Sequence, residues 1–447
     1  MRISQLSNTR VGLLGYGVEG RSALAALRRS GNTLPVTVFV DDPVTAATVD
    51  HSPGIVFASA REPNFDDIGV LIRSPGFAPS HAARAAADAR GLPQTTATNL
   101  FFNELRAFGI SSIGVTGSKG KSTTSTLIAR ALKESGVPSS LVGNIGAPVL
   151  ESLEGVITNR AVPVIELSSY QCADLEAAPT ISVLLQLFPE HMDWHGSIDA
   201  YYRAKMRIAQ QQRAGDTFFY LKDNQAYVEG FDIPSTREAV GTEASVHWGE
   251  GAFWRGHERL FSDECVRIPG QHNKQNICCV IAAASVAGAT LEGIQIALNG
   301  FSGLPYRLQD EGLHGGIRWV NDSISTAPEA AAAALRAFQD TTRTLIFGGF
   351  DRGYEMAPML AALRESTVEQ VILLPTTGHR LATELAHSDI HVKVVEVPDL
   401  RAAVAAAFEG TPRGGLCLFS PGAPSYGFFR DFEDRGRQFS ALLREFA

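Results

Sequence analysis

The stretch Gly114-Val-Thr-Gly-Ser-Lys-Gly-Lys-Ser122 gives the clearest indication of how this chain folds. It follows a short apolar run at residues 112–115 and opens a helical pattern at residues 123–132, so we expect a strand, a glycine-rich turn and a helix. Glycines let backbone N–H groups turn inward around an anion, and the helix N-terminus adds partial positive charge. In that geometry Lys121 reaches the β- and γ-phosphates of a nucleotide, and the Ser122 hydroxyl binds Mg²⁺. The stretch therefore predicts a phosphate-binding loop.

The loop departs from the common G-x-x-x-x-G-K-[ST] pattern at one position. Val115 occupies the first place, and Gly114 lies one residue earlier. A glycine turn that serves only to join a strand to a helix is the alternative interpretation. The position of Gly-Lys-Ser at the start of the helix favours phosphate binding.

Two later segments place possible metal ligands at the ends of strands. Glu166 follows the apolar residues 162–165, and His191 follows the apolar residues 181–188. Mg²⁺ prefers oxygen ligands and accepts a partial shell completed by water, phosphate and an occasional imidazole. The alternative is that Glu166 caps the next helix and His191 is an ordinary histidine. Zinc is disfavoured, because no third nitrogen or sulfur ligand has a suitable spacing.

The N-terminal segment Gly15-Tyr-Gly-Val-Glu-Gly20 follows an apolar run at residues 11–14 and precedes Asp41 by about 20 residues. This arrangement is typical of a dinucleotide fingerprint. Taken alone it is a weak signal, compatible with an NAD-dependent dehydrogenase. A purely structural role, close packing of helix on strand, is a further possibility for Gly20.

Composition and patterning limit the class of protein. The 447 residues are 45% hydrophobic and 19% charged, with a net charge of −8, which favours a globular protein of several domains without a large nucleic-acid-binding surface. Alternating strand-like and helical runs predict parallel sheets covered by helices. The five cysteines show no CxxC pair, and no signal peptide or membrane-spanning run is evident. We therefore expect a cytoplasmic α/β protein with no stable membrane insertion.

Taken together, the motifs resemble those of the Mur ligases of peptidoglycan synthesis, most closely the glutamate-adding branch. The resemblance covers nearly the whole chain. Besides the phosphate loop it rests on Asn144-Ile-Gly146, Glu166-Leu-Ser-Ser-Tyr-Gln171, Glu190-His-Met-Asp193, Tyr202-Arg-Ala-Lys-Met-Arg-Ile208, His272-Asn-Lys-Gln-Asn276, Gly303-Leu-Pro-Tyr-Arg307, Asn321-Asp-Ser323 and Ser420-Pro421.

The resemblance implies three domains and a reaction. A Rossmann-like domain at residues 1–108 would bind the UDP end of the substrate, a central P-loop domain at 109–301 would bind ATP, and a Rossmann-like domain at 302–447 would bind the amino acid. The enzyme would phosphorylate the carboxylate of UDP-N-acetylmuramoyl-L-alanine, and the amine of glutamate would displace the phosphate. It would act as a monomer on these small molecules, with ATP and two Mg²⁺ ions.

The resemblance also assigns individual residues. Lys121, Lys205, His191 and Asn144 would be catalytic, and Ser122, Glu166, His191 and a Lys205 carbamylated by CO₂ would support the metal. ATP would meet Gly114, Thr116, Gly117, Ser118, Lys119, Gly120, Lys121, Ser122, Thr123, Asn273, Asn276, Arg307 and Asp322, with His272 beside them. The UDP-substrate would meet Gly15, Tyr16, Gly17, Asp41, Gly76, Ser168 and Gln171, and glutamate would meet Thr326, Arg352, Ser425 and Phe432.

The chain departs from the family pattern on the amino-acid side. Members that use D-glutamate usually carry a D-S-K-x-T-N run, whereas here Ile324 replaces the lysine and Ala327 the asparagine. Arg352 likewise stands where a lysine is common, and arginine binds carboxylates bidentately. These changes favour slightly the variant that adds L-glutamate, with ordinary D-glutamate addition as the alternative. A folylpolyglutamate-type ligase, an NAD-dependent dehydrogenase and a non-catalytic nucleotide sensor are the rival classes.

Overall fold

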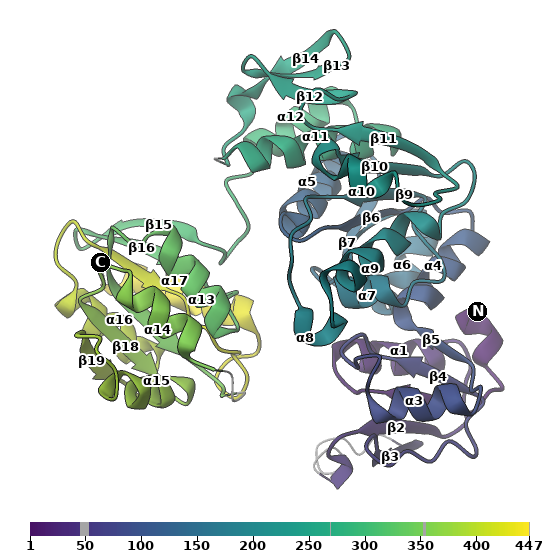
Figure 1. Cartoon of the computed structure of the whole chain (residues 1–447), viewed down its shortest axis with the longest axis horizontal. Coiled ribbons are helices and arrows are strands. Elements are labelled where there is room, and N and C mark those ends of the chain that lie inside the picture. The colour runs from purple at the N-terminus through teal and green to yellow at the C-terminus, as the bar shows by residue number, and fades with distance from the viewer. Residues whose placement is uncertain (45–52, 269, 352–354, 447) are drawn as a thin grey trace. The chain divides into compact units, whose positions relative to one another are not determined.

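The computed structural model describes residues 1–44, 53–268, 270–351 and 355–446. The chain forms two compact units, Met1–Ser302 and Gly303–Ala447 (Figure 1). None of the helices in the described ranges combines the length and apolar character needed to cross a lipid bilayer.

The first unit begins with a five-stranded parallel sheet in the order β3-β2-β1-β4-β5. Apolar side chains of β1 and β2 are buried against α1 and α4 in one continuous core. The elements are η1 (Ile3–Leu6), β1 (Val11–Leu14), α1 (Val18–Arg29), β2 (Val36–Val40), β3 (Ile55–Ser59), β4 (Val70–Arg73), α3 (Ala82–Ala89), β5 (Gln94–Thr96) and α4 (Ala97–Ala107).

The same unit contains a six-stranded sheet in the order β11-β10-β9-β6-β8-β7, whose paired strands are all parallel. Because β6 lies between β8 and β9, the loops at the carboxyl ends of these three strands meet at one edge. The elements are β6 (Ile113–Thr116), α5 (Lys121–Glu134), β7 (Ser139–Gly143), α6 (Val149–Thr158), β8 (Val162–Glu166), α7 (Ser169–Ala173), β9 (Ile181–Leu184), α8 (Met192–His195), α9 (Ile198–Gln210), β10 (Thr217–Leu221), η2 (Lys222–Asn224), α10 (Gln225–Val228) and β11 (Thr236–Val240).

Residues 217–267 contain β10, β11 and a small antiparallel sheet, β12-β13-β14. Two helices then complete the first unit, and both pack against α5. The elements are β12 (Val246–Gly249), β13 (Ala252–Arg255), β14 (Glu258–Ser262), η3 (Asp263–Cys265), α11 (Gln271–Val286) and α12 (Leu291–Asn299).

The second unit is a six-stranded sheet in the order β15-β16-β20-β17-β18-β19, parallel except for β15. One core packs α13, α14 and α15 on one face, and another packs α16 and α17 on the opposite face. The elements are β15 (Gln309–His314), β16 (Ile317–Asn321), α13 (Pro328–Ala337), β17 (Thr342–Gly348), α14 (Ala357–Arg364), β18 (Gln370–Leu374), α15 (Thr377–Ala386), β19 (Lys393–Glu396), α16 (Leu400–Gly410), β20 (Leu416–Phe419) and α17 (Phe432–Phe446).

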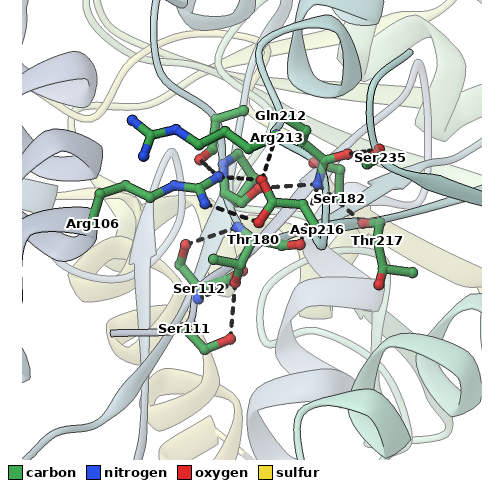
Figure 2. Close-up of polar contacts among 12 residues, drawn as sticks. Arg106, Ser111, Ser112, Thr180, Ser182, Gln212, Arg213, Asp216, Thr217 and Ser235 are labelled. Atoms are coloured by element: carbon green, nitrogen blue, oxygen red, sulfur yellow. Dashed lines mark hydrogen bonds and ion pairs between the residues drawn. The ribbon is translucent and has the colours of Figure 1, made fainter. Parts of the chain in front are cut away.

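A buried polar network fixes the strand starts of the six-stranded sheet in the first unit (Figure 2). The Arg106 guanidinium at the end of α4 donates to both carboxylate oxygens of Asp216, at 2.9 and 2.5 Å, and to the carbonyl of Ala178 at 3.0 Å. Thr180 Oγ1 accepts the Ser112 N–H at 2.8 Å and donates to the Ser112 carbonyl at 2.9 Å. These bonds tie α4 to the sheet at the edge opposite the phosphate loop.

We expect Arg106→Ala to lower the free energy of unfolding of the first unit by about 3 kcal/mol, because it leaves the buried Asp216 carboxylate without its positively charged partner. Only 6% of the Asp216 side chain is exposed. Arg203→Ala is the matched control, since its ion pair with Asp199 is exposed on α9. Urea denaturation of both variants checks this. Equal, small losses would mean that the Arg106–Asp216 pair does not hold α4 in place.

Candidate active site

The loop between β6 and α5 has the backbone geometry of an anion cradle. Gly117 and Gly120 have φ values of 148° and 85°, which L side chains rarely adopt. Ser118 anchors the loop, because its N–H donates to the Gln186 carbonyl at 2.9 Å and its hydroxyl to the Phe188 carbonyl at 2.7 Å. No side chain caps α5, which begins at Lys121. An anion could therefore bind at this helix N-terminus.

Two lysines converge on this loop at one carbonyl oxygen. The Gly117 carbonyl accepts from Lys121 Nζ at 3.0 Å and from Lys205 Nζ at 2.8 Å. Lys205 comes from α9 and is only 1% exposed, with its Nζ 4.7 Å from the centre of the Tyr201 ring. Burial, followed by the nearby charge of Lys121, lowers the pKa of Lys205 to about 7. A large fraction of the Lys205 amine is therefore uncharged near neutral pH.

Glu166 presents a carboxylate beside the loop at the end of β8. Its Oε1 accepts the Asn144 side-chain N–H at 2.9 Å, and its Oε2 is buried without a hydrogen-bond partner. An orphaned carboxylate oxygen suits a divalent cation. The described residues hold no group of three or more His, Cys, Asp or Glu side chains that could bind a metal. Glu166 and the Ser122 hydroxyl nevertheless suit a partial Mg²⁺ shell that water and phosphate oxygens complete.

A second acidic group, Glu190, lies on the same edge. Its Oε1 pairs with Lys119 Nζ at 2.9 Å, and its Oε2 accepts from the Tyr201 hydroxyl at 3.5 Å. His191 follows in the left-handed region with φ of 58°, and its ring centre lies 5.1 Å from that of Tyr170. Sequence reasoning did not assign Glu190 or Tyr201 a role, although Glu190 opens the quoted E-H-M-D motif.

Helix α11 closes one side of the loop. A Cβ added at Gly120 would lie 2.4 Å from the side-chain nitrogen of Asn276, which is 6% exposed. Asn273 lies one turn earlier on the same helix. The structure therefore brings the predicted nucleotide residues Asn276 and Gly120 together. Gly114 lies inside β6, where a Cβ would come within 2.5 Å of Pro179, so packing alone accounts for this glycine.

The Gly15–Gly20 segment borders a cavity of about 450 Å³ at the carboxyl edge of the first sheet. A Cβ at Gly20 would lie 2.3 Å from the Gly15 carbonyl, whereas Gly17 and Gly76 face open space. The predicted substrate residues Gly15, Tyr16, Gly17, Asp41 and Gly76 all line the cavity, together with Val18, Glu19, Val40, Ser74, Pro75 and Phe77.

Gln171 connects this cavity to the six-stranded sheet. Its side-chain oxygen accepts the Ser168 N–H at 2.9 Å in the capping box that begins α7. Its side-chain nitrogen donates to Glu19 Oε1 at 2.8 Å. Burial raises the pKa of Glu19, against the smaller effect of that hydrogen bond. Glu19 escaped sequence reasoning, because it occupies a variable place of the glycine motif and its partner lies 152 residues away.

In the second unit the predicted residues surround the carboxyl ends of β16 and β20. Asp322 accepts the Leu308 N–H at 3.2 Å and the Ser420 hydroxyl at 2.7 Å, and burial raises its pKa to about 6. Because Leu308 binds Asp322, the preceding residue, Arg307, lies close to Asp322. Arg352 lies outside the described residues.

The buried Arg435 joins the loops that carry the predicted amino-acid residues. It donates to the Ser323 carbonyl at 2.7 Å and to the Ala423 carbonyl at 2.9 Å. The Ser323 hydroxyl in turn donates to the Phe432 carbonyl at 2.8 Å. Ser425 is buried two residues beyond Ala423. Sequence reasoning missed Arg435, whose position within an amphipathic helix gives no signal of burial.

Comparison with known proteins identifies two family domains. Residues 115–284 match the Mur ligase middle domain, and residues 307–422 match the Mur ligase, glutamate ligase domain. A UDP-N-acetylmuramoyl-L-alanine–L-glutamate ligase of Xanthomonas axonopodis pv. citri is 35% identical over 99% of this chain and 96% of the relative. A protein of the same name from Micromonospora sp. is 34% identical over 100% of this chain and 99% of its own length.

Solved structures agree at the level of the fold. UDP-N-acetylmuramate–alanine ligase MurC of Thermotoga maritima has a TM-score of 0.55 and 17% identity, covering 98% of this chain and 100% of that one. MurF ligase from Thermotoga maritima in complex with ADP has a TM-score of 0.55 and 16% identity, covering 99% and 97%. The α/β fold with parallel sheets is thus that of the Mur ligases, as expected from the motifs.

We expect Gly120→Ala to weaken ATP binding by about tenfold or more, because the new methyl group would displace Asn276 or the loop. Gly136→Ala is a matched control at the other end of α5, with φ of 73° and nothing within 4 Å of the added Cβ. Both variants should lose about 1 kcal/mol of stability to backbone strain. Calorimetric titration with ATP checks the difference. Similar affinities for the two variants would contradict the assignment of Gly120 to a nucleotide cradle.

Proposed function

This chain belongs to the Mur ligase family, and from that premise we propose that it joins L-glutamate to UDP-N-acetylmuramoyl-L-alanine at the cost of ATP. It is an ATP-dependent, amide-bond-forming ligase. The observation that carries the proposed substrates is the full-length similarity, at 34–35% identity, to relatives named as L-glutamate ligases. The convergence of Lys121, Lys205 and Glu166 on one loop supports ATP chemistry at the edge of the six-stranded sheet.

The proposed reaction has two steps. A carboxylate oxygen of the UDP-substrate attacks the γ-phosphorus of ATP, and ADP leaves, which gives an acyl phosphate. The glutamate amine then attacks the acyl carbon and gives up a proton, an amide forms, and inorganic phosphate leaves with the former carboxylate oxygen. Phosphoryl transfer needs positioning and charge neutralisation more than covalent help from the protein. The loop amides and Lys121 would provide this for the β- and γ-phosphates.

The metal side of the site would combine Glu166, Ser122 and His191. Mg²⁺, when bound, would offset the charge that builds on the transferring phosphoryl group. Asn144 holds Glu166 through its side-chain amide and would orient that carboxylate toward the cation. Thr116, Ser118, Lys119, Thr123 and Asn273 would line the rest of the nucleotide site.

We further propose that Lys205 is carbamylated. Its buried, largely uncharged amine is the form that attacks CO₂: a nitrogen–carbon bond forms and a proton leaves. The resulting carbamate would be anionic, so it would relieve the repulsion between Lys205 and Lys121 and could support the metal. The hydrogen bond from Lys205 Nζ to the Gly117 carbonyl, at 2.8 Å, supports a carbamate beside the phosphate loop.

The cavity at Gly15–Gly20 would hold the UDP end of the substrate, with the N-terminus of α1 toward the diphosphate and Asp41 toward the uridine. Ser168 and Gln171 would reach the sugar side. The domain at residues 302–447 would bind the amino acid through Thr326, Arg352, Ser425 and Phe432. In this scheme residues 1–108 and 109–301 are separate domains, and the dehydrogenase alternative is not favoured.

The most specific part of the proposal is that the enzyme uses L-glutamate and not D-glutamate. With ATP and Mg²⁺ present, we expect amide product from UDP-N-acetylmuramoyl-L-alanine and L-glutamate at a kcat/KM at least about tenfold above that with D-glutamate. Chromatography of the product with each enantiomer checks this. Preference for D-glutamate would support the ordinary member of the family instead. Turnover with lysine or diaminopimelate but neither glutamate would overturn the proposed substrate.

Lys205→Ala should lower kcat by a factor of about 100 or more, because a group that supports the metal is lost. Acetate or propionate should restore part of that activity by occupying the place of the carbamate. With ¹³C-labelled bicarbonate, the wild-type protein should show a carbamate carbon resonance that the variant lacks. Lys205→Arg is the control, since it keeps a long side chain that can donate hydrogen bonds but cannot form a carbamate, so it too should lack this resonance. Absence of the resonance from the wild-type protein would remove the carbamate from the scheme.

A further inference from the structure

A cavity of about 450 Å³ lies in the second unit between the start of α16 and the C-terminal half of α17. It is also lined by the ends of β17 and β18, at Gly348, Gly349, Leu374 and Pro375. Its volume is within the range of about 300–1,000 Å³ that small-molecule sites occupy. None of the described residues assigned above to ATP, the UDP-substrate or glutamate lines it.

The cavity lies where two neighbouring strands send the chain to opposite faces of the sheet. Strands β18 and β19 are parallel neighbours. Helix α15 follows β18 and packs on the face that carries α13 and α14, whereas α16 follows β19 and packs with α17 on the other face. The two connections therefore separate at the carboxyl ends of these strands, and such a crevice is where ligands bind in open α/β sheets.

Aromatic and aliphatic side chains supply much of the lining. Phe428 and Phe429 come from the segment between β20 and α17, and Leu442 comes from α17 itself. Phe428 is 48% exposed, although removing a phenylalanine ring from water is strongly favourable. The cavity therefore suits a ligand with a planar, apolar body that covers this ring.

The charged groups of the lining disfavour an anion. Asp399 Oδ1 accepts the Ala402 N–H at 2.8 Å, so the start of α16 already has a carboxylate of its own. Arg401 Nη1 and Nη2 each donate to one carboxylate oxygen of Glu445, both at 2.7 Å. The described lining thus holds two acidic groups against one basic group. A positively charged ligand is favoured, and the aromatic rings add to its attraction.

The cavity is connected to the loop that carries Ser425, one of the residues assigned to glutamate. The N–H groups of Phe428 and Phe429 donate to the Ser425 carbonyl at 3.3 and 3.0 Å. Gly349 lies against the same loop, because a Cβ added there would be 2.6 Å from the Pro424 carbonyl oxygen. A ligand that contacts the two phenylalanines therefore acts on the backbone that holds Ser425.

We propose that this cavity binds a small organic cation with an aromatic body, and that its occupancy strengthens binding of the amino-acid substrate. The ligand would restrain Phe428 and Phe429 and, through them, the Ser425 carbonyl. Coupling of this kind is reciprocal, so each ligand raises the affinity for the other by the same factor. The effect on the amino acid rests on the proposed function, whereas binding of the cation does not.

Three indole compounds test the chemistry of the site, because they share one ring system and differ in charge. In calorimetric titrations the full-length protein should bind tryptamine, a cation, at least about fivefold more tightly than neutral indole, and indole-3-acetate, an anion, more weakly than either. Asp399→Asn removes a negative charge yet keeps an N-cap acceptor, so it should weaken tryptamine binding about threefold and leave indole binding within about twofold of the wild type. Equal or tighter binding of the anion would overturn the inference.

Ala441→Trp tests the location, because Ala441 is exposed on α17 and lines the cavity. Filling the space should abolish tryptamine binding with little change in melting temperature. Ala333→Trp is the matched control, since Ala333 is exposed on α13 and does not line the cavity, and it should bind tryptamine as the wild type does. Tryptamine binding that survives Ala441→Trp would overturn the inference.

Saturating tryptamine should lower the KM for glutamate at least about twofold in the wild type and in Ala333→Trp, and leave it unchanged in Ala441→Trp. An unchanged KM in a wild-type protein that binds tryptamine would contradict the coupling through Ser425. A protein that binds tryptamine in the cavity but consumes no glutamate of either hand would defeat the proposed function, and with it the coupling, but not the ligand site. The two failures are therefore distinguishable.

Discussion

The candidate active site is built around one backbone carbonyl, that of Gly117, which accepts hydrogen bonds from both Lys121 and Lys205. Burial makes it costly to charge Lys205, and repulsion from the nearby Lys121 adds to that cost, so the pKa of Lys205 falls to about 7. Gly117 itself adopts a φ of 148°, a conformation that L side chains rarely take. In the proposed mechanism Lys121 would serve the phosphates and Lys205 would carry the carbamate.

Parallel strand order explains why distant motifs meet at that carbonyl. The loops after β6, β8 and β9 share one edge, so Glu166 and the segment before His191 approach the glycine loop without any sequence proximity. The strands at residues 11–14, 112–115 and 162–165 could be predicted, because their apolar runs are local. The phosphate loop could be predicted for the same reason, since its residues are consecutive and precede the first turn of α5.

Contacts between distant residues could not be predicted in this way. Lys205 reads as an ordinary surface lysine of a helix, and its burial arises only when α9 packs beside the loop. The Glu19–Gln171 hydrogen bond and the buried Arg435 likewise depend on tertiary packing.

In the proposed mechanism, the substrate carboxylate is activated by phosphorylation at this site. Turnover of UDP-N-acetylmuramoyl-L-alanine labelled with ¹⁸O in its free carboxylate tests it most directly, with the released phosphate examined by mass spectrometry. We expect each phosphate to carry one oxygen from the carboxylate, because the acyl–oxygen bond breaks when the amine attacks. Unlabelled phosphate formed together with the amide product would contradict an acyl phosphate and the role given to the glycine loop.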